Sequence, residues 1–283
     1  MPVIRKNPTV PDYFVEIPEV TLDPRTARPV THLVEESKVL VFPNLKPRID
    51  FDFWAGLDTA PYPGVAKLNT VVTDDGNSAA DVAERAARLR KAGLPEPLAD
   101  ALGARMADLL AQVLPVYRAL FDGYKFTRGN VFWRLNDIYA TKMHIDCYGQ
   151  PINDHMARMF INLDNQPRIW HTSWRTDDLV EMARGKIPAD LARSLSPNDL
   201  WTELNKQSFG ASVNEWWQEV QRHAVFFHPG DVWVVDSRLI AHQIFYGRRT
   251  VSIDFVVDTP SMLDPAGHYL ARAARAKEYL SAQ

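Results

Sequence analysis

Residues 228–252 read HPGDVWVVDSRLIAHQIFYGRRTVS, a run of short apolar segments separated by turn residues. Together with the flanking residues, this stretch predicts four strands, over 224–227, 231–236, 239–245 and 250–257. Pro229-Gly230 and Gly247 fit the intervening turns, because proline presets one turn dihedral and glycine accepts left-handed backbone. Short strands at such close spacing are typical of an all-β barrel or sandwich. The chain is therefore expected to fold around a β-core.

Strand-like and helical segments alternate in the rest of the sequence. Further strands are predicted over 38–43, 130–135, 140–146 and 157–163, where β-branched and aromatic residues gather. Alanine and leucine recur at helical spacing over 77–121, broken at Gly93-Leu94-Pro95, and a polar helical insertion is expected over 177–222. A last helix is predicted within 263–283. Because no repeat or flexible linker interrupts the chain, residues 1–283 are expected to form a single domain of helices around one β-core.

Composition excludes several classes of protein. The formal net charge is −3 and no run of lysine or arginine appears, which argues against nucleic acid as a partner. A single cysteine, Cys147, excludes an internal disulfide framework and a multi-cysteine metal site. The N-terminus has no apolar signal-peptide core and no 18 uncharged apolar residues run together, so we expect a cytoplasmic protein without a membrane span. A homo-oligomer stays possible.

Three residues have the types and spacing of a metal site. His144 and Asp146 lie two positions apart, so on an extended strand both side chains project to one side. His242 must come from another strand, and the helical insertion accounts for its distance along the chain. Two imidazoles and one carboxylate can bind one face of an octahedral ion such as Fe(II), which leaves places for a keto acid and dioxygen. Alternatively, His242 is an ordinary core histidine.

A keto acid with a second carboxylate needs a cation to bind it, and arginine suits this role because its fork is bidentate. Arg158 begins a predicted strand on which Asn162 shares its face, so both side chains can point into the core. Arg249 follows the turn after His242, and Ser252 lies just downstream on the same strand. Arg158 could instead form a salt bridge at the barrel rim, and Arg249 could be a solvated turn residue. Both candidates stay open on this evidence.

Residues near the expected mouth of the core could bind a small-molecule substrate. Arg134, Arg168 and Trp170 combine charge with an aromatic face, which suits an anionic or sugar-like molecule. Structural packing of Trp170 is an equal alternative. The sequence has no Gly-x-Ser-x-Gly elbow, Gly-x-Gly-x-x-Gly loop or Walker loop, so it offers little support for a hydrolase triad or a nucleotide site.

Several blocks of the sequence resemble the Fe(II)/2-oxoglutarate-dependent oxygenases, and among them the Kdo hydroxylase branch. These blocks are KVLVFPNL, VLPVYRALF, FWR, MHIDCYG, ARMFINLDNQPRIW, FFHPGDVWVVDSRLIAHQ and SMLDP, and they span most of the chain. The run Cys147-Tyr148-Gly149-Gln150 departs from the pattern of that branch, which leaves the substrate open. The resemblance in the block ARMFINLDNQPRIW favours Arg158 over Arg249 as the cation that binds 2-oxoglutarate.

The resemblance implies a double-stranded β-helix, the jelly-roll core also found in cupins, mainly β with flanking helices. It implies Fe(II) at His144, Asp146 and His242, with 2-oxoglutarate and O2 as cosubstrates of a hydroxylating dioxygenase. A small polar substrate, sugar-acid or amino-acid-like, is expected. Two other functions remain: a cupin-type metalloenzyme acting on a sugar without redox chemistry, and a non-catalytic β-barrel binding protein.

Overall fold

The computed structural model describes residues 1–72, 77–136, 140–146, 155–210 and 220–282. Its strands form two sheets. The run Cys147-Tyr148-Gly149-Gln150 and residues 211–219 of the predicted helical insertion lie outside the described residues. Among the helices described, none combines the length and apolar character needed to cross a membrane.

The larger sheet has seven strands and is antiparallel except for one parallel pair at its edge, β2 with β3. In spatial order its strands are β2 (Phe14–Glu16), β3 (Val39–Val41), β9 (Val232–Val234), β6 (His155–Asn162), β11 (Thr250–Val257), β5 (Phe126–Arg134) and β4 (Lys67–Val72). Strand β11, beside the central strand β6, is buried along its whole length, because β5 and β6 flank it and other elements cover its faces.

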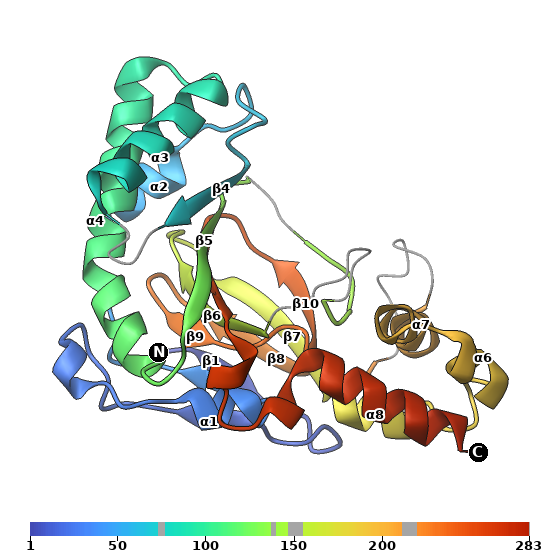
Figure 1. Ribbon diagram of the computed structural model, residues 1–283. Helices are drawn as coiled ribbons and strands as arrows, with labels where there is room; N and C mark the ends of the chain where they lie inside the picture. Colours follow the sequence, from blue (N-terminus) through green and yellow to red (C-terminus); the bar gives the residue numbers. More distant parts are fainter. Residues whose placement is uncertain (73–76, 137–139, 147–154, 211–219, 283) are drawn as a thin grey trace.

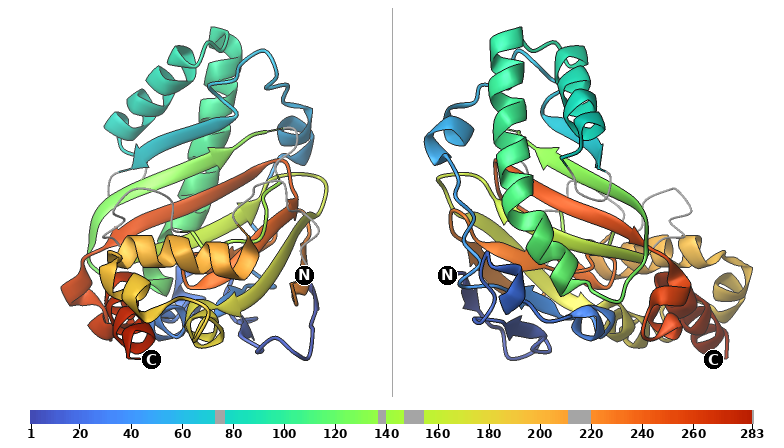
Figure 2. Two further views of the ribbon diagram at one scale, coloured as in Figure 1. Left: turned by 90° about the vertical axis from the view of Figure 1, so that its right-hand side faces the viewer. Right: turned by 60° about the vertical axis from the view of Figure 1, so that its left-hand side comes forward.

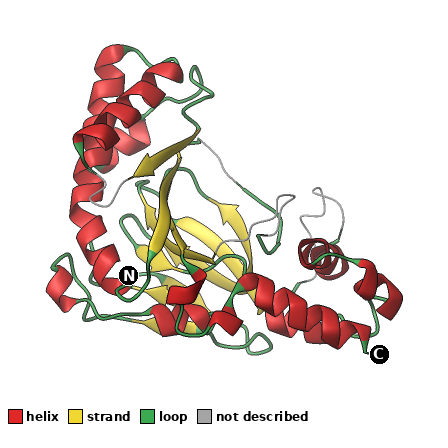
Figure 3. Cartoon of the chain, in the orientation of Figure 1, coloured by secondary structure: helices red, strands yellow, loops and turns green. Residues whose placement is uncertain are grey.

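The smaller sheet has four antiparallel strands. In spatial order they are β1 (Val3–Arg5), β8 (His223–Phe227), β7 (Arg168–Arg175) and β10 (Ile240–Tyr246). Strand β10 carries His242. Its pairing with β7 shifts register twice, between Ile240 and His242 and between Ile244 and Tyr246. The strands lie together in the middle of the molecule, with the helices outside them (Figure 3).

Eight α-helices are described, with three short 3-10 turns at 24–26, 259–261 and 265–267. They are α1 (Thr31–Glu35), α2 (Phe51–Gly56), α3 (Ala79–Lys91), α4 (Glu96–Leu120), α5 (Thr176–Met182), α6 (Ala189–Ser194), α7 (Pro197–Phe209) and α8 (Tyr269–Ser281). The predicted helical pair over 77–121 is confirmed as α3 and α4, and its break coincides with Gly93, which has a φ of 89°.

Two groups of helices cover the sheets on opposite sides of the molecule (Figure 1). The long helix α4 crosses the larger sheet, as Figure 2 shows, and buries Leu109, Val113 and Tyr117 in one cluster with Val131 and Phe255 of the sheet. Burial of a large apolar side chain contributes about 1.5–3 kcal/mol, so this face anchors the sheet firmly. On the other side, α5, α6, α7 and α8 form a second apolar cluster.

The expected class, mainly β with flanking helices, is confirmed. The two sheets do not close into a barrel among the described residues. One predicted strand is wrong: within 140–146 only His144 forms a β-bridge, and the residues beside it make no ladder. Strands β1, β2, β4 and β7 were not predicted. In β7 the alternating pattern is obscured, because both of its faces are partly buried and polar and apolar residues occur on each.

Candidate metal centre and its cavity

His144, Asp146 and His242 lie together in the structure. One ligand atom from each lies within 4.8 Å of the others, and this is the one such group of three among the described residues. Asp146 Oδ1 is 3.2 Å from His144 Nε2 and 4.0 Å from His242 Nε2. Two imidazole nitrogens and one carboxylate oxygen are therefore close enough to bind one ion.

Backbone hydrogen bonds hold the two histidines beside each other. The His144 and His242 peptides exchange both N–H···O bonds, at 3.0 and 2.7 Å, in an antiparallel bridge. Each ring also faces a carbonyl: His144 Nδ1 lies 2.6 Å from Lys142 O, and His242 Nδ1 lies 3.2 Å from Ile240 O. A carbonyl only accepts, so Nδ1 carries the proton and the Nε2 lone pair faces Asp146, the tautomer that a metal requires.

The electrostatics favour the protonation states that bind metal. Burial opposes ionisation of Asp146, but the nearby His144, His242 and Arg158 hold its pKa well below the usual value. Burial, together with the neighbouring His144, lowers the pKa of His242 to about 4. At neutral pH the site therefore offers an ionised carboxylate and a neutral His242 imidazole.

The second oxygen of Asp146 is held by two donors. Asp146 Oδ2 accepts from the Arg158 guanidinium at 2.7 Å and from Ser237 Oγ at 2.6 Å. Arg158 also donates to Asp254 Oδ2 at 2.9 Å, and Asp254 lies directly opposite Arg158 across strands β6 and β11. The two oxygens of Asp146 are thus divided: Oδ1 faces the imidazoles, and Oδ2 is occupied by the protein.

The three residues line a cavity of about 140 Å3. Four other residues predicted from the sequence to bind a cosubstrate or substrate share its wall with Arg158: Arg134, Arg168, Trp170 and Ser252. The Trp170 indole stacks on the His242 ring, with centroids 5.3 Å apart. Most of the predicted site residues are therefore brought together around one space.

Two predicted site residues lie elsewhere. Arg249 is buried and donates to the carbonyls of Trp54, Leu57 and Leu135, outside the cavity wall. Its place is thus structural: it ties the start of β11 to the segment around α2. Asn162 is also buried away from the cavity, where its amide donates to Gln166 O and Phe227 O.

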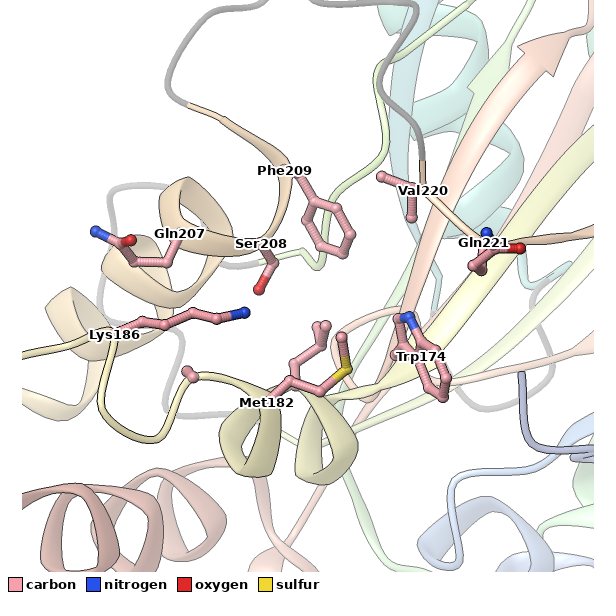
Figure 4. Close-up of a pocket in the computed structure, with 10 residues that line it drawn as sticks. Trp174, Met182, Lys186, Gln207, Ser208, Phe209, Val220 and Gln221 are labelled. Carbon is pink, nitrogen blue, oxygen red and sulfur yellow. The ribbon is translucent and has the colours of Figure 1, made fainter. Parts of the chain in front are cut away.

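A second cavity, of about 190 Å3, lies between α5, α7 and the chain leading into β8 (Figure 4). Trp174, Met182 and Phe209 face it, with Lys186 as its charged residue. None of the described residues around it belongs to the His-Asp-His group. The chemistry proposed below belongs to the other cavity, although this one is larger.

Comparison with solved structures gives crystal structures of KdoO, described as a Kdo hydroxylase and a non-haem Fe(II) alpha-ketoglutarate-dependent dioxygenase. The form with succinate and Fe(III) matches with a TM-score of 0.57 at 15% identity, over 94% of this chain and 96% of that one. The apo form matches with a TM-score of 0.54 at 17% identity, over 95% of this chain and 98% of that one. The chain shares the KdoO fold. No family model and no curated protein matches the sequence.

The expected likeness to the Kdo hydroxylase branch is confirmed as a likeness of fold. Three residues of the site were missed by the sequence reasoning: Ser237 and Thr250 in the cavity wall, and Asp254 as the partner of Arg158. A polar residue inside the buried strand β11 was the available signal for Asp254, because an acid there needs a partner on a neighbouring strand. Ser237 contacts Asp146 from a segment far away in the sequence, which spacing alone does not reveal.

Proposed function

We propose that this protein is a non-haem Fe(II)/2-oxoglutarate-dependent dioxygenase with a double-stranded β-helix core. It hydroxylates an unactivated C–H bond of a small polar substrate. The observation that carries the proposal is the His144, Asp146 and His242 group in the wall of a cavity that polar and aromatic side chains line. The likeness to the KdoO fold supports the same reading.

The donor set suits Fe(II). Nitrogen from imidazole and oxygen from carboxylate are ligands that ferrous iron accepts, and three ligands leave coordination places for other molecules. When bound there, Fe(II) supplies activation of dioxygen, with 2-oxoglutarate as the source of two electrons. Asp146 occupies the position that a halide would need, which favours hydroxylation over halogenation.

Arg168 is the residue that we assign to the far carboxylate of 2-oxoglutarate. It is buried in the cavity wall on β7, two residues before Trp170 and therefore on the same face of the strand. Its guanidinium lies so close to Gly247 that a Cβ there would come within 2.9 Å of Cζ, so the turn after β10 is shaped around it. A flat, confined guanidinium binds a carboxylate bidentately.

Thr250 supplies a hydroxyl in the wall of the same cavity. Its Oγ1 is buried and has no hydrogen-bond partner among the residues described, and Thr250 lines the same cavity. A buried hydroxyl without a partner costs about 1–3 kcal/mol, so a ligand that bonds to it gains affinity. The Arg158 guanidinium already donates to Asp146 and Asp254, so it holds the Asp146 carboxylate in place beside the histidines.

The substrate class follows from the remaining cavity wall. Arg134 lies over the Phe132 ring at 5.5 Å and is partly exposed, so a cation and an aromatic face meet solvent beside the metal residues. These groups suit a small molecule with a carboxylate and a hydroxylated or amine-bearing body. We therefore propose a sugar-acid or amino-acid-like substrate.

The test is to incubate the protein with Fe(II), 2-oxoglutarate and a panel of sugar acids and amino acids, and to measure succinate and oxygen together. We expect succinate to form in step with oxygen uptake, and one class of compound to accelerate both. The Asp146→Ala variant serves as the control for unspecific iron chemistry. Conversion of a sugar without oxygen uptake would indicate the non-redox metalloenzyme, and tight metal retention without any turnover would indicate a binding protein.

A further inference from the structure

The segment that carries two of the proposed ligands has little support from the sheets. Within 140–146, the backbone pairs with β10 only at Thr141 and His144, and the Asp146 N–H donates to Ser237 O at 3.1 Å. Ile145, between the two ligands, has no ladder partner among the described residues. A peptide in that position would be free to rotate, and its rotation would turn His144 and Asp146 apart.

One side chain from the helical insertion supplies the missing backbone partner. Asn205 of α7 accepts from the Ile145 N–H through Oδ1 at 2.9 Å and donates to the Ile145 carbonyl through Nδ2 at 3.0 Å. An amide that accepts and donates at a single residue reproduces the pair of bonds that a neighbouring strand would make. Ile145 is held at both of its backbone polar groups.

Packing fixes the same residue from its other side. The Ile145 side chain is fully buried, in one apolar cluster with Leu200, Trp201 and Leu204 of α7. Those three residues and Asn205 lie on one face of the helix by the spacing of three and four residues. Because α7 also packs against α8, Asn205 belongs to a packed group of helices rather than to a loop.

We infer that Asn205 is a positioning residue of the metal centre. By holding the Ile145 peptide it fixes the separation and direction of His144 and Asp146, and it gives the helical insertion a role as a brace for the ligand segment. This inference rests on the proposed function, since it presupposes that these residues bind Fe(II). Loss of groups that orient metal ligands typically lowers metal affinity about 10- to 100-fold.

The experiment uses Co(II) as the probe, because its visible spectrum reports both binding and ligand geometry. The full-length protein is titrated as wild type, Asn205→Asp, Asn205→Leu, Gln207→Ala and His242→Ala, and each metal-free variant is also unfolded with urea. Asn205→Asp keeps an acceptor for the Ile145 N–H and replaces the donor to the Ile145 carbonyl with a carboxylate oxygen. Gln207 is the matched control, an exposed amide on the same helix that bonds to Glu203 at 2.9 Å.

We expect both Asn205 variants to bind Co(II) about 10- to 100-fold more weakly than wild type, with an altered spectrum, while Gln207→Ala binds as wild type does. If Asn205 acted on stability alone, the urea midpoint would fall while the Co(II) affinity and spectrum of the folded Asn205→Asp protein stayed unchanged; that result overturns the inference. Failure of the wild type to bind Co(II), or binding that survives in His242→Ala, overturns the proposed metal site itself and the inference with it.

Discussion

Four arginines that the sequence predicts to bind a cosubstrate or a substrate have different surroundings in the fold. Arg158 is paired with two carboxylates, Arg249 with three carbonyls, and Arg134 and Arg168 face the cavity. The sequence places all four near the metal residues but does not give their partners, because those come from strands and loops distant along the chain. The period-2 alternation of strand residues correctly predicted that Arg158 lies on the cavity face of β6. It could not predict that Asp254, on the neighbouring strand, forms an ion pair with Arg158.

Replacement of Arg168 tests which arginine binds the cosubstrate. Arg168→Leu removes the bidentate donor, so we expect the dissociation constant for 2-oxoglutarate to rise about 10- to 100-fold, since hydrogen bonds to charged groups contribute about 1.5–3 kcal/mol. The measurement is an anaerobic titration of the Fe(II)-loaded protein. Arg168→Lys should fall between wild type and Arg168→Leu, and an unchanged constant in Arg168→Leu would clear this residue of the role.

Arg249 serves as the contrasting case. Arg249→Leu leaves three buried carbonyls, of Trp54, Leu57 and Leu135, without this donor, so we expect a loss of about 3 kcal/mol in the free energy of unfolding. The affinity of the folded protein for 2-oxoglutarate should stay close to that of wild type. A urea titration and the same ligand titration give both values, and a selective loss of affinity with normal stability would contradict the assignment.

His155 makes stability depend on pH. Burial lowers its pKa to about 4, despite Asp236 at 3.5 Å, and its ring is fully enclosed. The His155 ring takes up a proton near pH 6.5 in the unfolded chain and only near pH 4 in the folded protein. Its contribution to the free energy of unfolding is therefore fully present above pH 6.5 and is lost as the pH falls toward 4. Between pH 7 and pH 5 wild type should lose about 2 kcal/mol more than His155→Gln. Equal losses in urea titrations at both pH values would disprove this.

At the scale of elements, β6 and β11 are joined by a charged pair in register. Asp254 is fully buried opposite Arg158, and burial raises its pKa even with that partner present. Arg158→Met leaves this acid unpaired, and removal of one partner from a buried pair costs about 3–5 kcal/mol. Adding Asp254→Asn to Arg158→Met should recover part of that loss. Thermal and urea unfolding of the single and double variants check the prediction, which fails if Arg158→Met is as stable as wild type.

Elements with a regular pattern could be predicted, and those defined by tertiary contacts could not. The strand over 250–257 and the helices on each side of Gly93 follow from residue spacing alone. The segment 140–146 has strand-like composition, yet most of its partners are single side chains or isolated backbone groups, so no ladder forms. Strand β7 was missed because its sequence, RIWHTSWR, mixes polar and apolar residues on both faces.

At the scale of the whole molecule, the cavity exists because the two sheets bring distant segments to one place. Residues from β5, β6, β7, β10 and β11 form its wall, together with the segment that carries His144 and Asp146. Each helical group covers a different side of this core and buries its own apolar cluster. The sequence predicted the ligand types and the β-core, while the separation of the two sheets and the volume between them depend on packing that no local pattern encodes.

Anaerobic addition of Fe(II) and then 2-oxoglutarate to the protein, followed by visible absorption, tests most directly whether the protein binds both. If His144, Asp146 and His242 hold Fe(II) in the cavity and 2-oxoglutarate chelates it, a metal-to-ligand charge-transfer band should appear at one equivalent of iron. The band should be absent in Asp146→Ala and in His242→Ala. No band in wild type, or a band that survives in both variants, would show that these three residues do not hold Fe(II) for 2-oxoglutarate.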